Sequence, residues 1–177
     1  NFDLSVFING SYGNKVYNYL SMKLTHMNSP WTNQLNAVNG RAQLVPINPN
    51  KVYEDGTMWY NDVSNVMVAN PGASIPRATI NDPNDNDRIS DRYIEDGSYI
   101  RLKNISLGYT FPKKTIDKLG LSNLRIYANI QNLLTITGYG GYDPEIGAST
   151  SSVNVYGLDN GRYPSPTVYS FGLNVSF

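Results

Sequence analysis

The sequence predicts an all-β fold, and three observations lead to that prediction. First, residues 167–177 alternate with a period of two, which is the period of a strand, between large apolar and small polar side chains. Second, three further stretches repeat this alternation, at residues 2–10, 99–111 and 124–134. Third, a composition with 15 Gly, 10 Pro and 14 Tyr among 177 residues favours strands and loops over helices.

The stretch at 167–177 matches a strand that crosses a membrane. About ten alternating residues span a bilayer when one face meets lipid and the other meets a wet lumen. The chain closes on a large aromatic, whereas termini usually fray into polar residues. A half-buried strand of a soluble β-sandwich would show the same alternation, so that interpretation stays open. The apolar set of this stretch is Tyr169, Phe171, Leu173, Val175 and Phe177.

The alternation assigns faces in the other predicted strands as well. In residues 124–134 we expect Leu124, Ile126, Ala128 and Ile130 to face lipid or apolar packing. The expected lumen-facing residues are Arg125, Asn129, Gln131, Asn174 and Ser176. In residues 99–111 the apolar parity switches between Leu102 and Ile105, which predicts a β-bulge near Lys103-Asn104.

Charge and composition exclude several classes of function. With 14 Lys+Arg and 14 Asp+Glu the formal charge is zero, so the basic excess of a nucleic-acid binder is missing. The chain has no Cys, and this removes disulfides and thiolate metal sites. No apolar run approaches the roughly 18 residues of a membrane-spanning helix, and the mean hydropathy is −0.38. The chain begins with Asn1 in what reads as mid-strand, and we therefore expect a fragment of a longer precursor.

Two long loops separate the predicted strands, at residues 11–96 and 135–166. Within the first, spacings of three and four predict a short amphipathic helix over residues 14–28. Prolines then recur too closely for long regular elements. Aromatic side chains in these loops could stack on a sugar or a partner protein, or pack together as the loops' own small core. These candidate contact residues are Trp31, Tyr53, Trp59, Tyr60, Tyr139 and Tyr142.

One polar run offers oxygen ligands of the kind that calcium prefers, Asn81-Asp82-Pro83-Asn84-Asp85-Asn86-Asp87. It lacks the glycine and glutamate of an EF-hand loop, so calcium and a solvated turn are both open interpretations. His26 has no second His or Cys to share a metal, and no metal role is expected for it.

No catalytic motif stands out, and we predict that the protein is not an enzyme. Asp143 and Glu145 lie two residues apart, but a nucleophile elbow, a phosphate loop and a metal-ligand pair are all missing. Two carboxylates in a loop are usually a solvated turn or a polar contact to a substrate. No cofactor is predicted apart from the open question of calcium.

Several runs occur in an order that resembles a known family. They cover residues 96–112, 124–134 and 141–145, followed by Arg162-Tyr163-Pro164 and the final Phe177. This series resembles the C-terminal end of the SusC/RagA family of TonB-linked outer-membrane transporters. Residues 3–14 resemble the preceding barrel strand of that family, while residues 27–90 match little, as a variable loop would.

The resemblance implies a fold, partners and a location. Family members form a barrel of about 22 strands with a plug domain, in the outer membrane of Gram-negative bacteria. TonB energises import of glycans, oligosaccharides or peptides, and a SusD-like surface lipoprotein closes over the mouth. This chain would be about the last four strands, with residues 169–177 as the assembly signal, the two long loops outside the cell and a periplasmic turn at 112–123. The alternative is a soluble carbohydrate-binding or adhesive β-domain.

Overall fold

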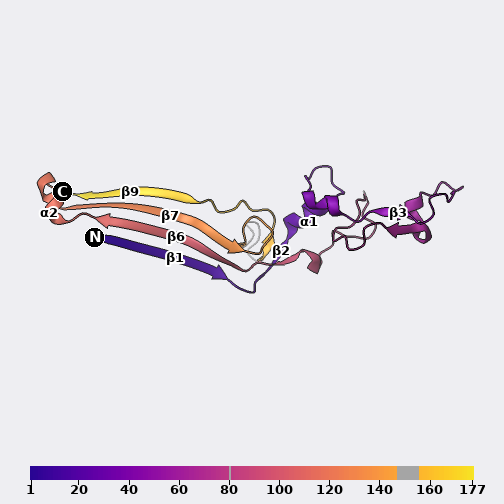
Figure 1. Ribbon diagram of the computed structural model, residues 1–177, viewed down its shortest axis with the longest axis horizontal. Coiled ribbons are helices and arrows are strands. Elements are labelled where there is room, and N and C mark those ends of the chain that lie inside the picture. The colour runs from indigo at the N-terminus through magenta and orange to yellow at the C-terminus, as the bar shows by residue number, and fades with distance from the viewer. Residues whose placement is uncertain (80, 147–155) are drawn as a thin grey trace. The chain divides into compact units, whose positions relative to one another are not determined.

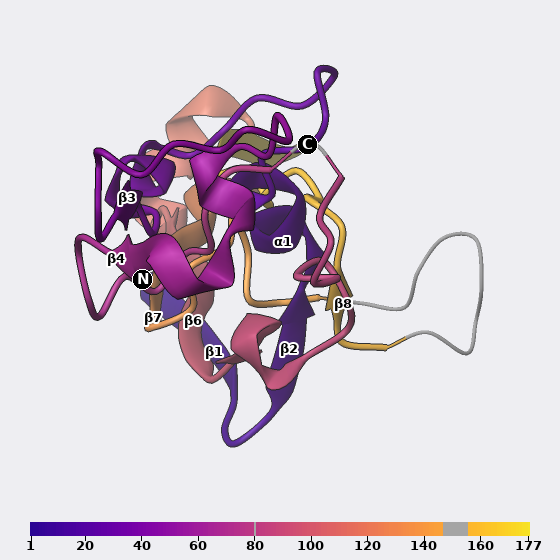
Figure 2. The same ribbon diagram turned by 90° about the vertical axis from the view of Figure 1, so that its right-hand side faces the viewer.

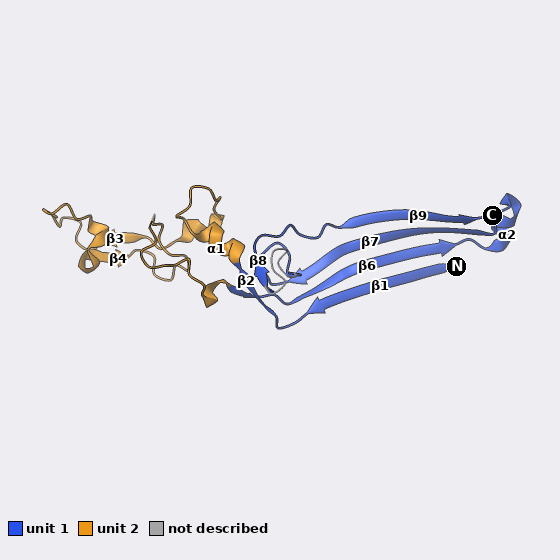
Figure 3. Cartoon of the chain, turned by 180° about the vertical axis from the view of Figure 1, so that it is seen from behind, with its two compact units in different colours: residues 1–18, 94–177 blue, residues 19–93 orange. Residues whose placement is uncertain are grey.

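The computed structural model describes residues 1–79, 81–146 and 156–177 (Figure 1). The chain divides into two compact units, drawn in separate colours in Figure 3. Unit 1 consists of Asn1–Asn18 and Ile94–Phe177, and unit 2 is Tyr19–Tyr93. None of the helices in the described parts of the chain has both the length and the apolarity that a membrane crossing requires.

The main sheet of unit 1 has four antiparallel strands in the order β1-β6-β7-β9, which lie side by side in Figure 1. They overlap the four ranges expected from the alternation. Their bounds are β1 Phe2–Ser11, β6 Tyr99–Thr110, β7 Asn123–Thr137 and β9 Val168–Ser176.

The register of this sheet keeps like residues together across all four strands. One row of paired residues is apolar and runs Leu4, Leu107, Ala128, Phe171. The next row is polar and runs Ser5, Ser106, Asn129, Ser170. Because a slip by one residue would exchange the two faces, this register preserves the separation of apolar from polar side chains.

The predicted bulge at Lys103 is confirmed. The register of β6 shifts between Leu102 and Asn104 against β7, and the pairing with β1 shifts between Phe7 and Ile8. Against β1, Lys103 is the extra residue of β6, whereas against β7 the single Lys103 faces two residues of β7, Asn132 and Leu133. As a result Leu102 pairs with Ile8 while Ile105 pairs with Val6, so residues of opposite parity share one face.

The connection between β6 and β7 is short and partly helical. It contains α2 Lys113–Ile116 and the 3₁₀ turn η5 Asp117–Leu119. Gly120 ends the turn with φ of 69°, a left-handed conformation that glycine adopts without strain.

A second sheet of unit 1 replaces the first part of the predicted helix. It has the order β5-β2-β8, with bounds β2 Lys15–Asn18, β5 Ile94–Asp96 and β8 Leu158–Asp159. Figure 2 labels β2 and β8. The prediction of a helix over residues 14–28 is therefore wrong for residues 15–18. Val16 and Tyr17 have high strand propensity, and pairing on both sides of β2 buries Val16 to 1% exposure.

Unit 2 is built from short pieces, and the sequence alone predicted a loop over most of it. Among its described residues, the buried hydrophobic ones are Val38, Ile75 and Tyr93. Prolines keep the pieces short, because each removes a backbone donor. The elements are α1 Tyr19–Thr25, η1 Asn36–Gly40, β3 Leu44–Pro46, η2 Trp59–Asn61, η3 Val63–Asn65, β4 Val66–Val68 and η4 Asp91–Tyr93, with β3 and β4 paired antiparallel.

Candidate functional site

The apolar face of the four-stranded sheet is exposed over its whole width. Phe2 in β1 is 76% exposed, and Phe171 in β9 is 83% exposed. Residues between them on the same face, such as Leu107 and Ile126, are about half exposed. Soluble monomers seldom expose an apolar patch of this extent, and such patches mark contacts with a membrane or another protein.

The expected assembly-signal residues follow this face. Tyr169, Phe171, Leu173 and Val175 pair with the alternate residues Ile130, Ala128, Ile126 and Leu124 of β7. Phe177 lies just beyond the end of β9 and is almost fully exposed. A role of these residues in assembly stays a prediction.

The opposite face of the sheet is polar and carries an ion pair that crosses a strand. Arg125 of β7 contacts Asp3 of β1, with 2.6 Å between Nη2 and Oδ2. β6 lies between these strands, and a Cβ on its Gly108 would come within 2.4 Å of Arg125. Glycine at this position is therefore what lets the two side chains meet over β6.

The loop after β7 is fixed to the polar side of β6 by a buried arginine. Arg101 is 3% exposed; its Nη2 donates to Asp143 at 2.5 Å and its Nη1 to Glu145 at 2.8 Å. Lys103 also contacts Glu145. Asp143 is buried, so the expectation of a solvated turn at Asp143 is wrong: the carboxylate serves as the partner of a buried guanidinium.

The environment of Asp143 favours its charged form. Burial alone would raise the pKa of Asp143, but hydrogen bonds from Arg101 and from the backbone N–H groups of Ser165 and Glu145 hold that pKa below its usual range. Sequence reasoning did not single out Arg101. The available signal was an arginine inside a predicted strand, two residues before Lys103.

Tyr139 is a structural residue of the same loop. It is buried, and its hydroxyl donates to Asp159 of β8 at 2.6 Å. Burial and the nearby carboxylate raise the pKa of Tyr139 well above its usual range. Tyr142, three residues further along, is 64% exposed and free to meet a partner.

Glu95 of β5 joins two connections of unit 1. Its Oε1 accepts from the side chain of Asn18 at 2.8 Å. Its Oε2 accepts from the backbone N–H of Gly140 at 2.9 Å. The carboxylate thus links the segment after β1 to the loop after β7.

The aromatic candidates of unit 2 separate into different environments. Tyr53 donates to Asp62 at 2.8 Å and accepts from Asn65 at 2.9 Å, as part of a local core. Trp31 is 92% exposed. Trp59 and Tyr60 contact each other edge to face, with ring centroids 5.7 Å apart, and both line a groove. The structure therefore brings together only the last two of the four.

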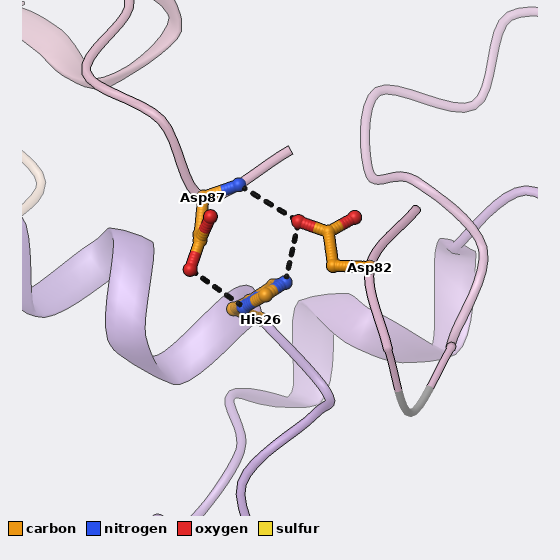
Figure 4. A group of neighbouring side chains, drawn as sticks. All are labelled: His26, Asp82 and Asp87. Atoms are coloured by element: carbon orange, nitrogen blue, oxygen red, sulfur yellow. Dashed lines mark hydrogen bonds and ion pairs between the residues drawn. The ribbon is translucent and has the colours of Figure 1, made fainter. Parts of the chain in front are cut away.

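His26 lies between two aspartates (Figure 4). Its Nε2 is 3.2 Å from Asp82, and its Nδ1 is 3.9 Å from Asp87. The three residues bring their potential metal-ligand atoms within 4.8 Å of one another. The two carboxylates, however, face different ring nitrogens. A single metal ion binds one of these nitrogens, so the observed arrangement suits a bridging imidazole better than a metal site.

The run 81–87 forms a turn around the Asp82 carboxylate. That carboxylate accepts from the Asn86 side chain at 2.7 Å and from the Asp87 backbone N–H at 3.2 Å. Burial alone would raise the pKa of Asp82, but these hydrogen bonds and the neighbouring His26 hold it below its usual range. Calcium binding at this run was one of two open interpretations and not a prediction, and nothing in this arrangement tests it.

Comparisons with known proteins point to one family. The chain is 34% identical over 182 aligned residues to TonB-dependent receptor P3 of Formosa agariphila, covering 100% of this chain and 15% of the relative. It is 36% identical over 93 residues to TonB-dependent receptor SusC of Bacteroides thetaiotaomicron, covering 51% of this chain and 8% of the relative. No family model matches this chain.

The fold agrees with these relatives. A solved structure of the RagAB peptide importer in its closed-closed state superposes with a TM-score of 0.64 at 18% identity. The match covers 99% of this chain and 16% of that one. The chain spans about a sixth of the length of the proteins that it matches end to end. It belongs to the SusC/RagA family of TonB-dependent receptors, of which it is a barrel segment.

Proposed function

We propose that this chain forms part of the wall of an outer-membrane transporter that is energised through TonB. The observation that carries the proposal is the two-faced sheet, whose apolar face is exposed across four strands while its other face is polar. In an outer-membrane barrel the apolar face contacts lipid, and the polar face contacts the water-filled lumen or the plug domain. A soluble carbohydrate-binding β-domain would leave the same apolar face bare in water.

The positions of the connections support an extracellular end. Ser11 at the end of β1 and Thr137 at the end of β7 both pair with Tyr99, so both long connections leave the sheet at one end. The short α2–η5 connection lies at the other end. Outer-membrane barrels carry long loops outside the cell and short turns in the periplasm.

The edges and the polar face offer places for the rest of the receptor. β1 and β9 lie at the two edges of the sheet, and their outer backbone groups would pair with neighbouring barrel strands. On the polar face the side-chain oxygens of Asn104 and Asn129 are buried without a hydrogen-bond partner in the described residues. A plug domain or bound water would satisfy them.

The family likeness supports a proposal for the substrate and the partner. The matched proteins include a peptide importer, and the family resemblance implies glycans, oligosaccharides or peptides as cargo. A SusD-like lipoprotein would contact the extracellular loops. Among the candidate aromatics, Trp31 and Tyr142 are the most exposed and suit such a contact, because interface cores are enriched in Trp and Tyr.

A pair of neighbouring substitutions tests the membrane assignment in the full-length receptor. Phe171→Lys places a charge on the apolar face, at a cost of about 2–4 kcal/mol near the bilayer midplane, while Ser170→Lys places it on the polar face. We expect the first variant to lower the amount of folded receptor in the outer-membrane fraction and the second to leave it near wild type. Equal amounts of the two variants would contradict the proposal.

A further inference from the structure

A groove of about 690 Å³ lies within unit 2. This size falls in the range of about 300–1,000 Å³ that is usual for small-molecule sites. Its walls come from three segments that are distant in sequence, around β3, η2 and the chain after Ile75. The lining residues are Arg41, Ala42, Gln43, Leu44, Trp59, Tyr60, Asn61, Arg77, Ala78, Thr79, Asn81 and Pro83.

Hydrogen bonds from backbone groups of the lining residues hold one wall of the groove in place and leave the lining side chains free of that task. The backbone N–H of Ala42 donates to the carbonyl of Ile75 at 2.8 Å. The side chain of Asn70 accepts from Gln43 N–H at 2.8 Å and donates to the Arg41 carbonyl at 2.9 Å. The wall is thus fixed before a ligand arrives, which lowers the entropy cost of binding.

The groove carries two positive charges and no negative one among its lining residues. Arg41 and Arg77 line it, and neither lies within ion-pair distance of a carboxylate in the described residues. The Arg41 side chain donates one N–H to the Val38 carbonyl at 3.2 Å, and its other N–H donors stay available to a ligand. Guanidinium groups bind carboxylate and sulfate oxygens through paired hydrogen bonds, so the charge pattern selects an anion.

The remaining lining residues suit a ring that bears hydroxyl groups. The Trp59 and Tyr60 rings meet at 80°, and Tyr60 is 42% exposed, so a ring surface is open to a ligand. Aromatic faces pack against the apolar face of a pyranose. The side-chain amides of three lining residues make no hydrogen bond to the described residues, and each can both donate to and accept from hydroxyls. They are Gln43, Asn61 and Asn81.

We propose that this groove binds an acidic saccharide, whose carboxylate or sulfate contacts Arg41 and Arg77 while a sugar ring lies against Trp59 and Tyr60. The proposal deepens the transporter assignment by naming a class of cargo, and it rests on that assignment for its biological role. A peptide of acidic residues would engage the arginines, but it has no ring face for the aromatic pair.

The test uses the full-length receptor, purified in detergent, and isothermal titration with three probes: tetragalacturonate, maltotetraose and tetraglutamate. We expect tetragalacturonate to bind most tightly, with an affinity that falls as salt is raised. Arg77→Gln and Trp59→Ala should each raise its Kd about tenfold or more, because each removes a charged hydrogen bond or a stacking surface.

Two control variants make the same kinds of change, loss of a positive charge and loss of an aromatic ring, outside the groove. Arg88→Gln removes an exposed arginine outside the groove, and Tyr12→Ala removes an exposed aromatic ring outside it. Both should leave the Kd unchanged. Binding of maltotetraose or tetraglutamate as tight as that of tetragalacturonate, no saccharide binding at all, or equal effects of groove and control variants would each overturn the proposal. A receptor that assembles normally but fails here overturns the groove alone, since assembly is measured by the Phe171 and Ser170 pair.

Discussion

At the scale of single residues, Arg101 has the largest predicted effect. It is buried and satisfies two carboxylates, so Arg101→Gln would leave Asp143 buried without its cation. Removing one partner of a buried pair typically costs about 3–5 kcal/mol. We expect faster backbone hydrogen exchange at residues 138–146 of the full-length receptor, measured by mass spectrometry.

Arg125→Gln is the control for this prediction. Arg125 also forms an ion pair from a strand of the same sheet, but its partner Asp3 is 53% exposed at the side chain. Exposed pairs contribute little, because water and salt screen them. If both variants change exchange at residues 138–146 equally, the tie between this loop and β6 does not depend on Arg101.

Asp82 predicts a pH dependence for the turn at residues 82–87. Its folded pKa is depressed, so its contribution to stability is fully present above the unfolded pKa of about 3.9 and is lost as pH falls through the lower folded value. We expect exchange protection of the turn to persist from pH 7 to about pH 5 and to fall below pH 4.

Asp82→Asn should remove that acid dependence and weaken the contact to His26 at every pH. Asp85→Asn is its control, because Asp85 is exposed and Asn tolerates its φ of 48° as well as Asp does. An unchanged acid profile in Asp82→Asn would show that another group controls the turn.

At the scale of elements, the bulge in β6 decides which side chains meet the bilayer. Lys103 is the extra residue of β6 against β1, so deleting it would restore a strict period of two in β6 and turn Ile100 and Leu102 to the opposite face. Lys103→Ala keeps the extra residue and removes only the contact to Glu145. We expect the deletion, and not the alanine variant, to lower the amount of heat-modifiable folded receptor. Normal assembly of the deletion variant would mean that β6 tolerates a register slip.

At the scale of the whole molecule, the main sheet could be predicted because its information is local. Alternation along each strand sets its face, and the switch of parity at Leu102 and Ile105 locates the bulge without knowledge of the partner strands. The same local reading failed at Val16 and Tyr17. There a spacing typical of a helix was overridden by pairing with β5 and β8, and β8 is about 140 residues away in sequence.

The candidate sites were less predictable because they depend on contacts between distant segments. Trp59 and Tyr60 could be selected from composition, but their grouping with Arg41 and Arg77 depends on the fold of unit 2. The oxygen-rich side chains around Asp82 could likewise be recognised in the sequence. The contact between His26 and Asp82 could not, because it depends on how the two segments pack. Tyr139 was chosen by the same criterion as Tyr142, yet only its burial against Asp159 shows its structural role.

The double use of the Glu95 carboxylate has a thermodynamic consequence. One oxygen accepts from Asn18 and the other from Gly140, so each hydrogen bond helps to hold the carboxylate in the position that the other one needs. Coupling of this kind is reciprocal: whatever free energy the first connection gives to the order of the second, the second returns to the first. A ligand or partner that orders one of these loops therefore also favours the ordered state of the other, without touching it.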